Sequence, residues 1–175
     1  YARQVAEYLD TQHHECIIEE SNLLDMIKEV IHAIESYDTT TVRASIGNYL
    51  IGKFIRENSD CKVILNGDGA DELLGGYLYF HNYKNDIEFD NEIKHLLSNI
   101  HFFDVLRSDR CIAAHGLEPR TPFLDNYLVN FYLSLPVYLR NHNNKNQMDR
   151  NQIERNQIER NQMEKQLLRD TVFSM

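Results

Sequence analysis

Hydrophobic and polar residues follow two different spacings along this chain. In several segments the apolar residues recur every three or four positions, which is typical of helices with one buried face. These segments are residues 5–9, 23–34, 46–54, 93–116, 128–135 and 164–173. Elsewhere the apolar residues form short runs, which predicts a strand over His14–Glu19 and a buried strand over Cys61–Leu65.

Helices that alternate with short strands indicate an α/β fold with a mostly parallel sheet. Helix outweighs strand in this chain, so we expect an incomplete sheet, part of which lies outside it. Pro119 and Pro122 predict an extended link after the long helix, because the residue before a proline avoids the helical region.

Residues 139–162 break the pattern. The pentapeptide Asn-Gln-Ile-Glu-Arg and close variants repeat through this stretch. Five residues advance a helix by roughly 500°, so each repeat would turn about 140° further around the axis. The apolar residues therefore cannot form the single stripe that a packed helix needs. We interpret 139–162 as a low-complexity, solvated insertion, and residues 1–138 and 163–175 as parts of one domain.

Composition narrows the class of protein. The 175 residues suffice for one domain with a core, and no apolar run approaches a membrane span. The formal charge of −9 disfavours non-specific binding to nucleic acid. It leaves room for a phosphate ligand, because Mg²⁺ bridges phosphates to carboxylates. Three cysteines without a paired spacing favour a reducing, cytoplasmic compartment.

The most informative segment is Asn66–Gly76, which we call the acidic loop. It directly follows the predicted strand and holds four of the chain's seven glycines. Its three carboxylates, Asp68, Asp71 and Glu72, could bind Mg²⁺ on a polyphosphate, or position an amine and accept its proton. An acidic surface turn that caps a helix near Asp71 would have the same local sequence.

Asp104 and Arg107 form a second candidate. They lie three residues apart and so share one face of the predicted long helix, where Asp104 interrupts the apolar stripe. Spacing alone favours an ordinary intrahelical ion pair. The alternative is a polar pocket.

Several segments together resemble one family, the synthetase domain of glutamine-dependent asparagine synthetases. Asn66–Glu72 is similar to the family's Ser-Gly-Glu-Gly-Ser-Asp-Glu, and Gly75–His81 to its Gly-Gly-Tyr-x-Tyr-Phe-His. Further segments are similar in the right order: Tyr37–Ser45, Phe103–Arg110, Gly116–Asp125 and Met163–Arg169. The resemblance covers nearly all of the chain except roughly 139–162.

The resemblance implies an adenine-nucleotide hydrolase-like fold, in which flanking helices cover a parallel sheet, and an ATP pyrophosphatase chemistry. Aspartate attacks the α-phosphate of Mg·ATP to give β-aspartyl-AMP and pyrophosphate. Ammonia from a glutaminase domain then displaces AMP and gives asparagine. The family further implies a homodimer of the full-length protein.

Roles for residues of the acidic loop follow from the same resemblance. Asn66 and Gly67 would contact the nucleotide. Asp68 would stand at the position tied to intermediate formation and ammonia attack. Asp71 would bind Mg²⁺ and pyrophosphate, and Glu72 would be a further catalytic residue.

The remaining roles concern aspartate. Asp104, Arg107 and Tyr77 would line its pocket, where a guanidinium can pair with a carboxylate through two hydrogen bonds.

The chain also departs from the family pattern. Asp68 is one methylene shorter than the family's glutamate, while Asn66 and Ala70 stand in place of serines. The chain contains no Ser-Gly-Gly-x-Asp-Ser pyrophosphate loop, so we expect a fragment that does not make asparagine alone. Two alternatives stay open: a related amide-forming adenylase for another carboxylate, as in β-lactam-forming relatives, or an impaired homologue with a binding or regulatory role.

Overall fold

The structure, a computed structural model, describes residues 1–83, 85–141, 143 and 165–173. Within these ranges the α-helices are α1 (Ala2–Tyr8), α2 (Glu20–Asp25), α3 (Ile27–Ile34), α4 (Thr39–Asn58), α5 (Ala70–Leu74), α6 (Asp86–Asn99), α7 (Asp104–Ala113), α8 (Asn126–Ser134), α9 (Val137–Arg140) and α12 (Gln166–Phe173). The strands are β1 (Val63–Leu65) and β2 (Glu118–Arg120), and the short 3₁₀ helices are η1 (Leu78–Asn82), η2 (Ile100–Phe102) and η3 (Pro122–Leu124). None of the described helices is long and apolar enough to cross a membrane.

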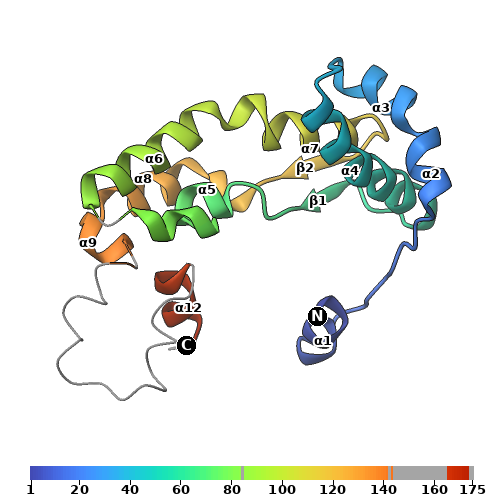
Figure 1. The fold of residues 1–175 in the computed structure, drawn as a ribbon. Helices are drawn as coiled ribbons and strands as arrows, with labels where there is room; N and C mark the ends of the chain where they lie inside the picture. The colour runs from blue at the N-terminus through green and yellow to red at the C-terminus, as the bar shows by residue number, and fades with distance from the viewer. Residues whose placement is uncertain (84, 142, 144–164, 174–175) are drawn as a thin grey trace.

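The two strands lie in the middle of an elongated arrangement (Figure 1). Helices α2, α3 and α4 gather at one end, and α5, α6, α8 and α9 at the other. Helix α7 packs against α3 and α4 and contacts β2 in the middle, and η2 connects it to α6 at the other end. Helix α1 stands apart on an extended segment (Figure 1).

Strands β1 and β2 pair in parallel, which confirms the predicted α/β class with a parallel sheet. Ile64 lies opposite Pro119 in the register. The neighbours of this proline make the backbone bonds, since Glu118 N donates to Lys62 O at 2.8 Å and Asn66 N donates to Arg120 O at 3.0 Å. A proline fits there because alternate residues of a strand bond to opposite sides, so its missing N–H faces away from β1. The predicted proline link is therefore a strand.

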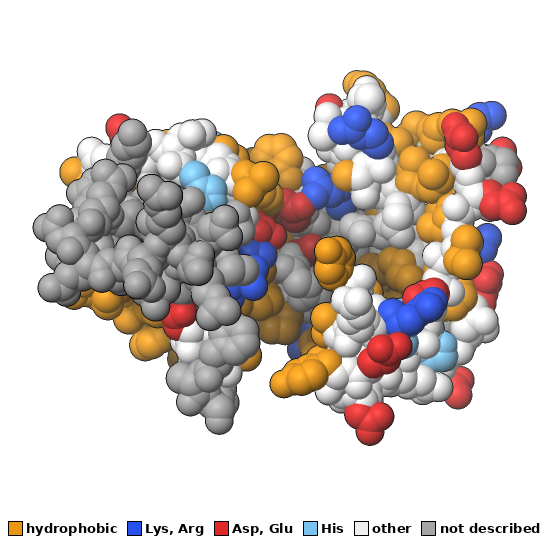
Figure 2. All heavy atoms as spheres, turned by 60° about the horizontal axis from the view of Figure 1, so that its bottom comes forward, with side chains coloured by type: hydrophobic (Ala, Val, Ile, Leu, Met, Phe, Trp, Pro, Cys, Tyr) orange, Lys and Arg blue, Asp and Glu red, His pale blue; other side chains and the backbone are white. Residues whose placement is uncertain are grey.

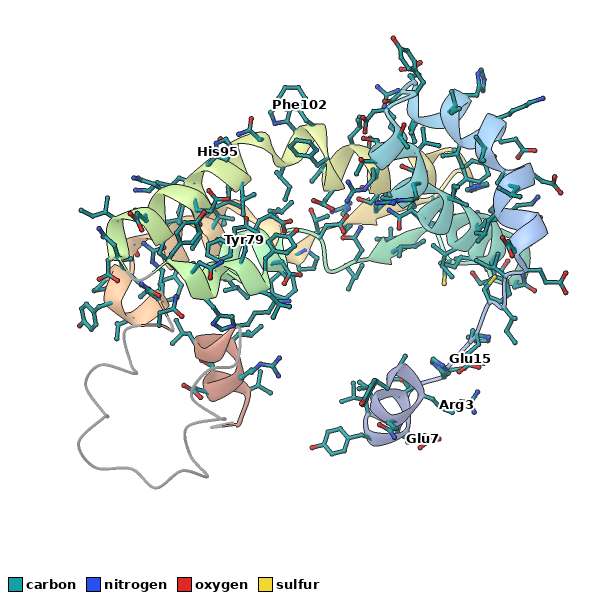
Figure 3. The ribbon with its side chains drawn as sticks, in the orientation of Figure 1. Arg3, Glu7, Glu15, Tyr79, His95 and Phe102 are labelled. Atoms are coloured by element: carbon teal, nitrogen blue, oxygen red, sulfur yellow. The ribbon has the colours of Figure 1, made fainter. Side chains whose placement is uncertain are left out.

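Two strand predictions need correction. Residues 14–19 contain no strand, and Ile17 is 89% exposed there. Instead, Glu15 pairs with the Arg3 guanidinium at 2.7 Å and ties this segment to α1 (Figure 3). The strand at Val63–Leu65 exists but is not buried, because Val63 is 50% and Leu65 72% exposed. An apolar run predicts a strand, but its burial depends on elements packed above and below it.

The predicted helix over 93–116 is interrupted. Helix α6 ends at Asn99, η2 follows, and α7 begins at Asp104 after Phe103 leaves the helical region with φ −122° and ψ −97°. The predicted helix over 23–34 is likewise divided between α2 and α3. The break at Phe103 places Asp104 in the first turn of α7, where a carboxylate is favoured by the helix dipole.

The described core consists of three hydrophobic clusters, centred on different helices. Their buried members are Val30, Ile34, Val42, Ile46 and Cys111 between α3, α4 and α7; Leu73, Leu74 and Tyr132 between α5 and α8; and Phe80, Phe89 and Ile93 between η1 and α6. The second cluster holds α5, the helix within the acidic loop, against α8.

Most of the predicted insertion, residues 142 and 144–162, lies outside the described residues. The first residues of the predicted insertion are packed and not solvated, which corrects that prediction: Arg140 and Asn141 are 4% and 0% exposed. The Arg140 guanidinium donates to Asp90 at 2.5 Å, and Asn141 donates to Asp86 at 3.0 Å. These bonds anchor the end of α9 on α6.

Gly75 occupies a position with no room for a side chain. It ends α5 in the left-handed region at φ +62°, and a Cβ there would stand 2.8 Å from Cζ of the buried Phe89. We expect Gly75→Ala to destabilise the fold by about 2 kcal/mol or more, from backbone strain and overpacking together. The control is Gly47→Ala on α4, where a Cβ has open space and should stabilise by roughly 0.5–1 kcal/mol. Urea denaturation measures both, and equal stability of the two variants would contradict the structure.

Candidate active site

The acidic loop leaves the carboxyl end of β1, which is where α/β sheets bind their ligands. After Leu65 the backbone turns through Gly67, whose carbonyl accepts from Ala70 N at 3.2 Å, and Gly69 adopts φ +85°. Helix α5 then begins at Ala70, so the helix near Asp71 that the alternative interpretation of the loop required is present. Gly67 is exposed, with open space around its Cα, so its backbone is accessible to a ligand.

Asp68 is held by two donors. The hydroxyl of Ser108 donates to the Asp68 carboxylate, and Asn66 Nδ2 donates to the same oxygen at 3.1 Å. Asp68 N in turn donates to Asn66 Oδ1 at 3.2 Å. Ser108 lies on α7 and is 4% exposed. The acidic loop is therefore bonded directly to the helix that carries Asp104 and Arg107.

Glu72 and Tyr77 form a second pair. The Tyr77 hydroxyl donates to the Glu72 carboxylate, which is only 5% exposed. Burial raises the pKa of Glu72, and the negative charges of Asp104 and Asp71 act in the same direction, against the bond from Tyr77. Burial and the bond to Glu72 raise the pKa of Tyr77. These effects place Glu72 and Tyr77 within electrostatic reach of Asp104, although α7 begins far along the chain.

Asp104 and Arg107 form the ion pair that their spacing predicts. Both side chains are partly buried, at 27% and 18% exposure. Ser108 of the same helix bonds to Asp68, so this pair lies beside the acidic loop, and the charge of Asp104 contributes to the raised pKa of Glu72. Arg110 of the same helix points elsewhere, since its guanidinium pairs with Glu35 at 2.6 Å.

Asp71 pairs with a residue from the far end of the described chain. Lys165 Nζ lies 2.8 Å from Asp71 Oδ1, just before α12 begins. Gly76 makes room for this contact, because a Cβ at that position would collide with both side chains. Ninety-four positions separate the partners, and no local pattern marks Lys165 as a site residue.

Magnesium has one predicted ligand, Asp71. No group of three or more His, Cys, Asp or Glu side chains suited to a metal exists among the residues that the structure describes. Mg²⁺ commonly uses one or two carboxylates together with substrate phosphates and water. Asp71 fits that role as a single ligand for a cation that arrives with phosphates, but it does not belong to a ready-made cage.

Figure 2 shows a face of the molecule that is hollowed at its middle, where acidic and basic side chains gather. Around the site, Tyr79 donates its hydroxyl to Glu92 of α6 at 2.9 Å and stacks on Tyr77, with 5.7 Å between the ring centroids (Figure 3). His95 and Phe102 lie farther along α6 and η2 (Figure 3). The ring of Tyr79 thus supports Tyr77 at this end of the site.

The same segments that build the site match a known family. The asparagine synthase family model matches residues 1–95 and residues 85–172, which together cover almost the whole chain. The chain belongs to the asparagine synthase family. Family membership agrees with the resemblance carried by the acidic loop and by α7.

Curated relatives are glutamine-hydrolysing asparagine synthetases. The protein of Mesocricetus auratus is 48% identical over 143 residues, that of Gallus gallus 49% over 143 residues, and that of Homo sapiens 47% over 143 residues. Each match covers 82% of this chain and 26% of the relative. The chain therefore spans about a quarter of the length of these synthetases.

The buried carboxylate of Glu72 should make the stability of the fold depend on pH. Its pKa is raised in the folded state, so the folded protein favours the protonated acid, and the buried charge opposes folding above that pKa. Gln at position 72 keeps an acceptor for Tyr77 without the charge. We expect Glu72→Gln to raise the thermal unfolding midpoint at pH 8, and this gain should disappear below the ordinary glutamate pKa of 4.5. A gain of equal size at pH 8 and pH 4 would show that the buried charge is not its source.

Proposed function

We propose that this chain forms part of the aspartate-activating site of an ATP-dependent asparagine synthetase. One observation carries the proposal beyond family membership. Asp68 of the acidic loop bonds to Ser108 of α7, and α7 presents Asp104 and Arg107 to the same site. Groups for the nucleotide and groups for the amino acid are thereby brought together at the carboxyl end of β1.

The proposed reaction has two steps. An oxygen of the aspartate β-carboxylate attacks the α-phosphorus of ATP, and the bond to pyrophosphate breaks, giving β-aspartyl-AMP. Ammonia then attacks the acyl carbon, the carbon–oxygen bond to AMP breaks, and one proton leaves the nitrogen. Both steps increase the negative charge on phosphate oxygens. The hydrogen-bond donors and cationic side chains of the chain must therefore offset the negative charge of its own carboxylates as well.

The pair of Asp104 and Arg107 suits aspartate as a zwitterion. Arg107 can bind a carboxylate through two charge-assisted hydrogen bonds, and Asp104 can accept from the α-ammonium group. In the structure each of these side chains is the partner of the other. The α-ammonium and α-carboxylate groups of the substrate can therefore replace the internal pair without leaving Asp104 or Arg107 unpaired, which limits the cost of opening it.

Asp68 is the carboxylate that we assign to intermediate formation and ammonia attack. It is placed by two hydrogen-bond donors, Ser108 and Asn66, and lies half-buried beside the exposed Gly67. A positioned carboxylate can accept the proton that ammonia loses when it becomes an amide. Glu72, buried and bonded to Tyr77, is assigned to supporting the aspartate pocket and its charge balance.

Nucleotide binding is assigned to Asn66 and Gly67, at the tip of the turn. Mg²⁺, when bound with the phosphates, supplies positive charge that offsets the charge of the leaving pyrophosphate. Asp71 is the residue that would hold it. In the structure Asp71 pairs with Lys165, so this lysine neutralises the charge of the carboxylate.

The proposal extends to the whole protein. An adenine-nucleotide hydrolase-like sheet is supported by the parallel pairing of β1 and β2. A glutaminase domain as the ammonia source is supported by the glutamine-hydrolysing relatives. The full-length protein is proposed to be a homodimer on the family resemblance alone. A cytoplasmic location is supported by three cysteines that are all free thiols.

Arg107→Ala in the full-length protein tests the aspartate assignment. We expect KM for aspartate to rise roughly 10- to 100-fold, the usual effect of losing a hydrogen-bonded charge, while KM for ATP stays within about twofold. Initial rates of asparagine formation at varied aspartate measure this. Arg110→Ala is the matched control, because the same helix carries Arg110 but its guanidinium pairs with Glu35.

An unchanged KM for aspartate in Arg107→Ala would contradict the assignment. Turnover of another carboxylate in preference to aspartate would instead favour the related amide-forming adenylase. A full-length protein with no turnover of any of these substrates would favour a binding or regulatory homologue.

The 175-residue chain by itself is expected to be inactive. It contains no Ser-Gly-Gly-x-Asp-Ser segment, and it matches only 26% of the length of its relatives. We expect no aspartate-dependent exchange of labelled pyrophosphate into ATP by this chain, with a full-length asparagine synthetase as the positive control. Exchange above the level seen without aspartate would refute this expectation.

A further inference from the structure

We propose that Ser108 is a positioning residue that holds the Asp68 carboxylate in its reactive orientation. This inference rests on the proposed function, because it assumes that Asp68 takes part in the reaction. Sequence patterns do not mark Ser108, since a serine within an amphipathic helix is ordinary. Its place in the structure is not ordinary: it is the α7 residue that bonds directly to a carboxylate of the acidic loop.

The bond is well defined by burial. Ser108 is 4% exposed, so water has little access to compete for its hydroxyl. The oxygen also lies 3.1 Å from the backbone carbonyl of Asp104, one turn earlier in the helix. A hydroxyl carries a single hydrogen and can donate it to only one of these acceptors. The Asp68 carboxylate is the better acceptor, because a charge-assisted bond is about twice as strong as a neutral one.

Without Ser108, the donors that the described residues supply to the Asp68 carboxylate would all come from its own loop. The other donor to its carboxylate is Asn66, two residues away in the same turn. A bond inside the turn fixes the carboxylate relative to the turn, but not relative to α7. The hydroxyl of Ser108 is the link that fixes Asp68 relative to Asp104 and Arg107, which lie within one turn of it on the same helix.

The bond between Ser108 and Asp68 keeps the Asp68 carboxylate at a constant distance from the proposed substrate pocket at Asp104 and Arg107. The loop reaches Asp68 just before the left-handed Gly69, where small backbone changes would move the side chain. A misplacement of about 1 Å at a reacting group can reduce a rate roughly 100-fold. Ser108 therefore acts on the rate through Asp68, without touching the substrate itself.

The test uses ammonia-dependent asparagine formation by the full-length protein. We expect Ser108→Ala to lower kcat about tenfold or more, with KM for aspartate and for ATP within about twofold. Alanine has the higher helix propensity, so α7 should be retained, and a thermal unfolding midpoint above the assay temperature verifies this. Ser134→Ala on α8 is the matched control, because its hydroxyl donates to the Phe131 carbonyl of its own helix, and we expect a normal kcat.

A second variant separates positioning from a structural role. In an Asp68→Asn background, measured on the residual rate, Ser108→Ala should cause less than about a twofold further loss, since the two changes then remove one shared interaction. A full loss from Ser108→Ala in both backgrounds, or a normal kcat for Ser108→Ala alone, would overturn the proposal. A wild-type rate in Asp68→Asn would overturn it together with the proposed role of Asp68, whereas the Arg107→Ala result tests the aspartate site separately.

Discussion

Three residues of β1 pair with three of β2, and the arrangement of the candidate site depends on this pairing. The chain between the two strands contains α5, α6 and α7, so the pairing closes a long excursion and returns α7 alongside the start of the acidic loop. Pro119 can take part because its position needs no N–H toward β1. Without this short parallel pairing, Asp68 and Ser108 would not be brought close enough to form a hydrogen bond.

The site tolerates four crowded carboxylates because each has its own donor. Asp104 pairs with Arg107, and Asp71 with Lys165. The other two are bonded to hydroxyl groups, Asp68 to that of Ser108 and Glu72 to that of Tyr77. These partners offset the electrostatic repulsion between the carboxylates, which would otherwise disfavour four negative charges in a partly buried site. In the proposed function the two ion pairs exchange partners with charged ligands, whereas the two hydroxyl pairs maintain the geometry.

The glycines of the acidic loop allow close packing as well as access for a ligand. Gly75 lies against Phe89, and Gly76 lies against the Asp71–Lys165 pair, so neither position has room for a side chain. Gly67 is different, because its surroundings are open. The glycine cluster therefore has two purposes: the exposed member leaves space for a ligand, and the later members let α5 and η1 pack closely.

Local sequence determined the acidic loop, the strand before it, helix α4 and the Asp104–Arg107 pair, because each depends on neighbours a few residues apart. It was wrong about residues 14–19 and about the burial of β1, and it did not reveal the break at Phe103, the strand at Pro119 or the contacts of Ser108 and Lys165 with the acidic loop. These features depend on partners 40 to 94 positions away or on which faces are covered. Periodicity reports which residues share a face; only the tertiary structure decides what that face meets.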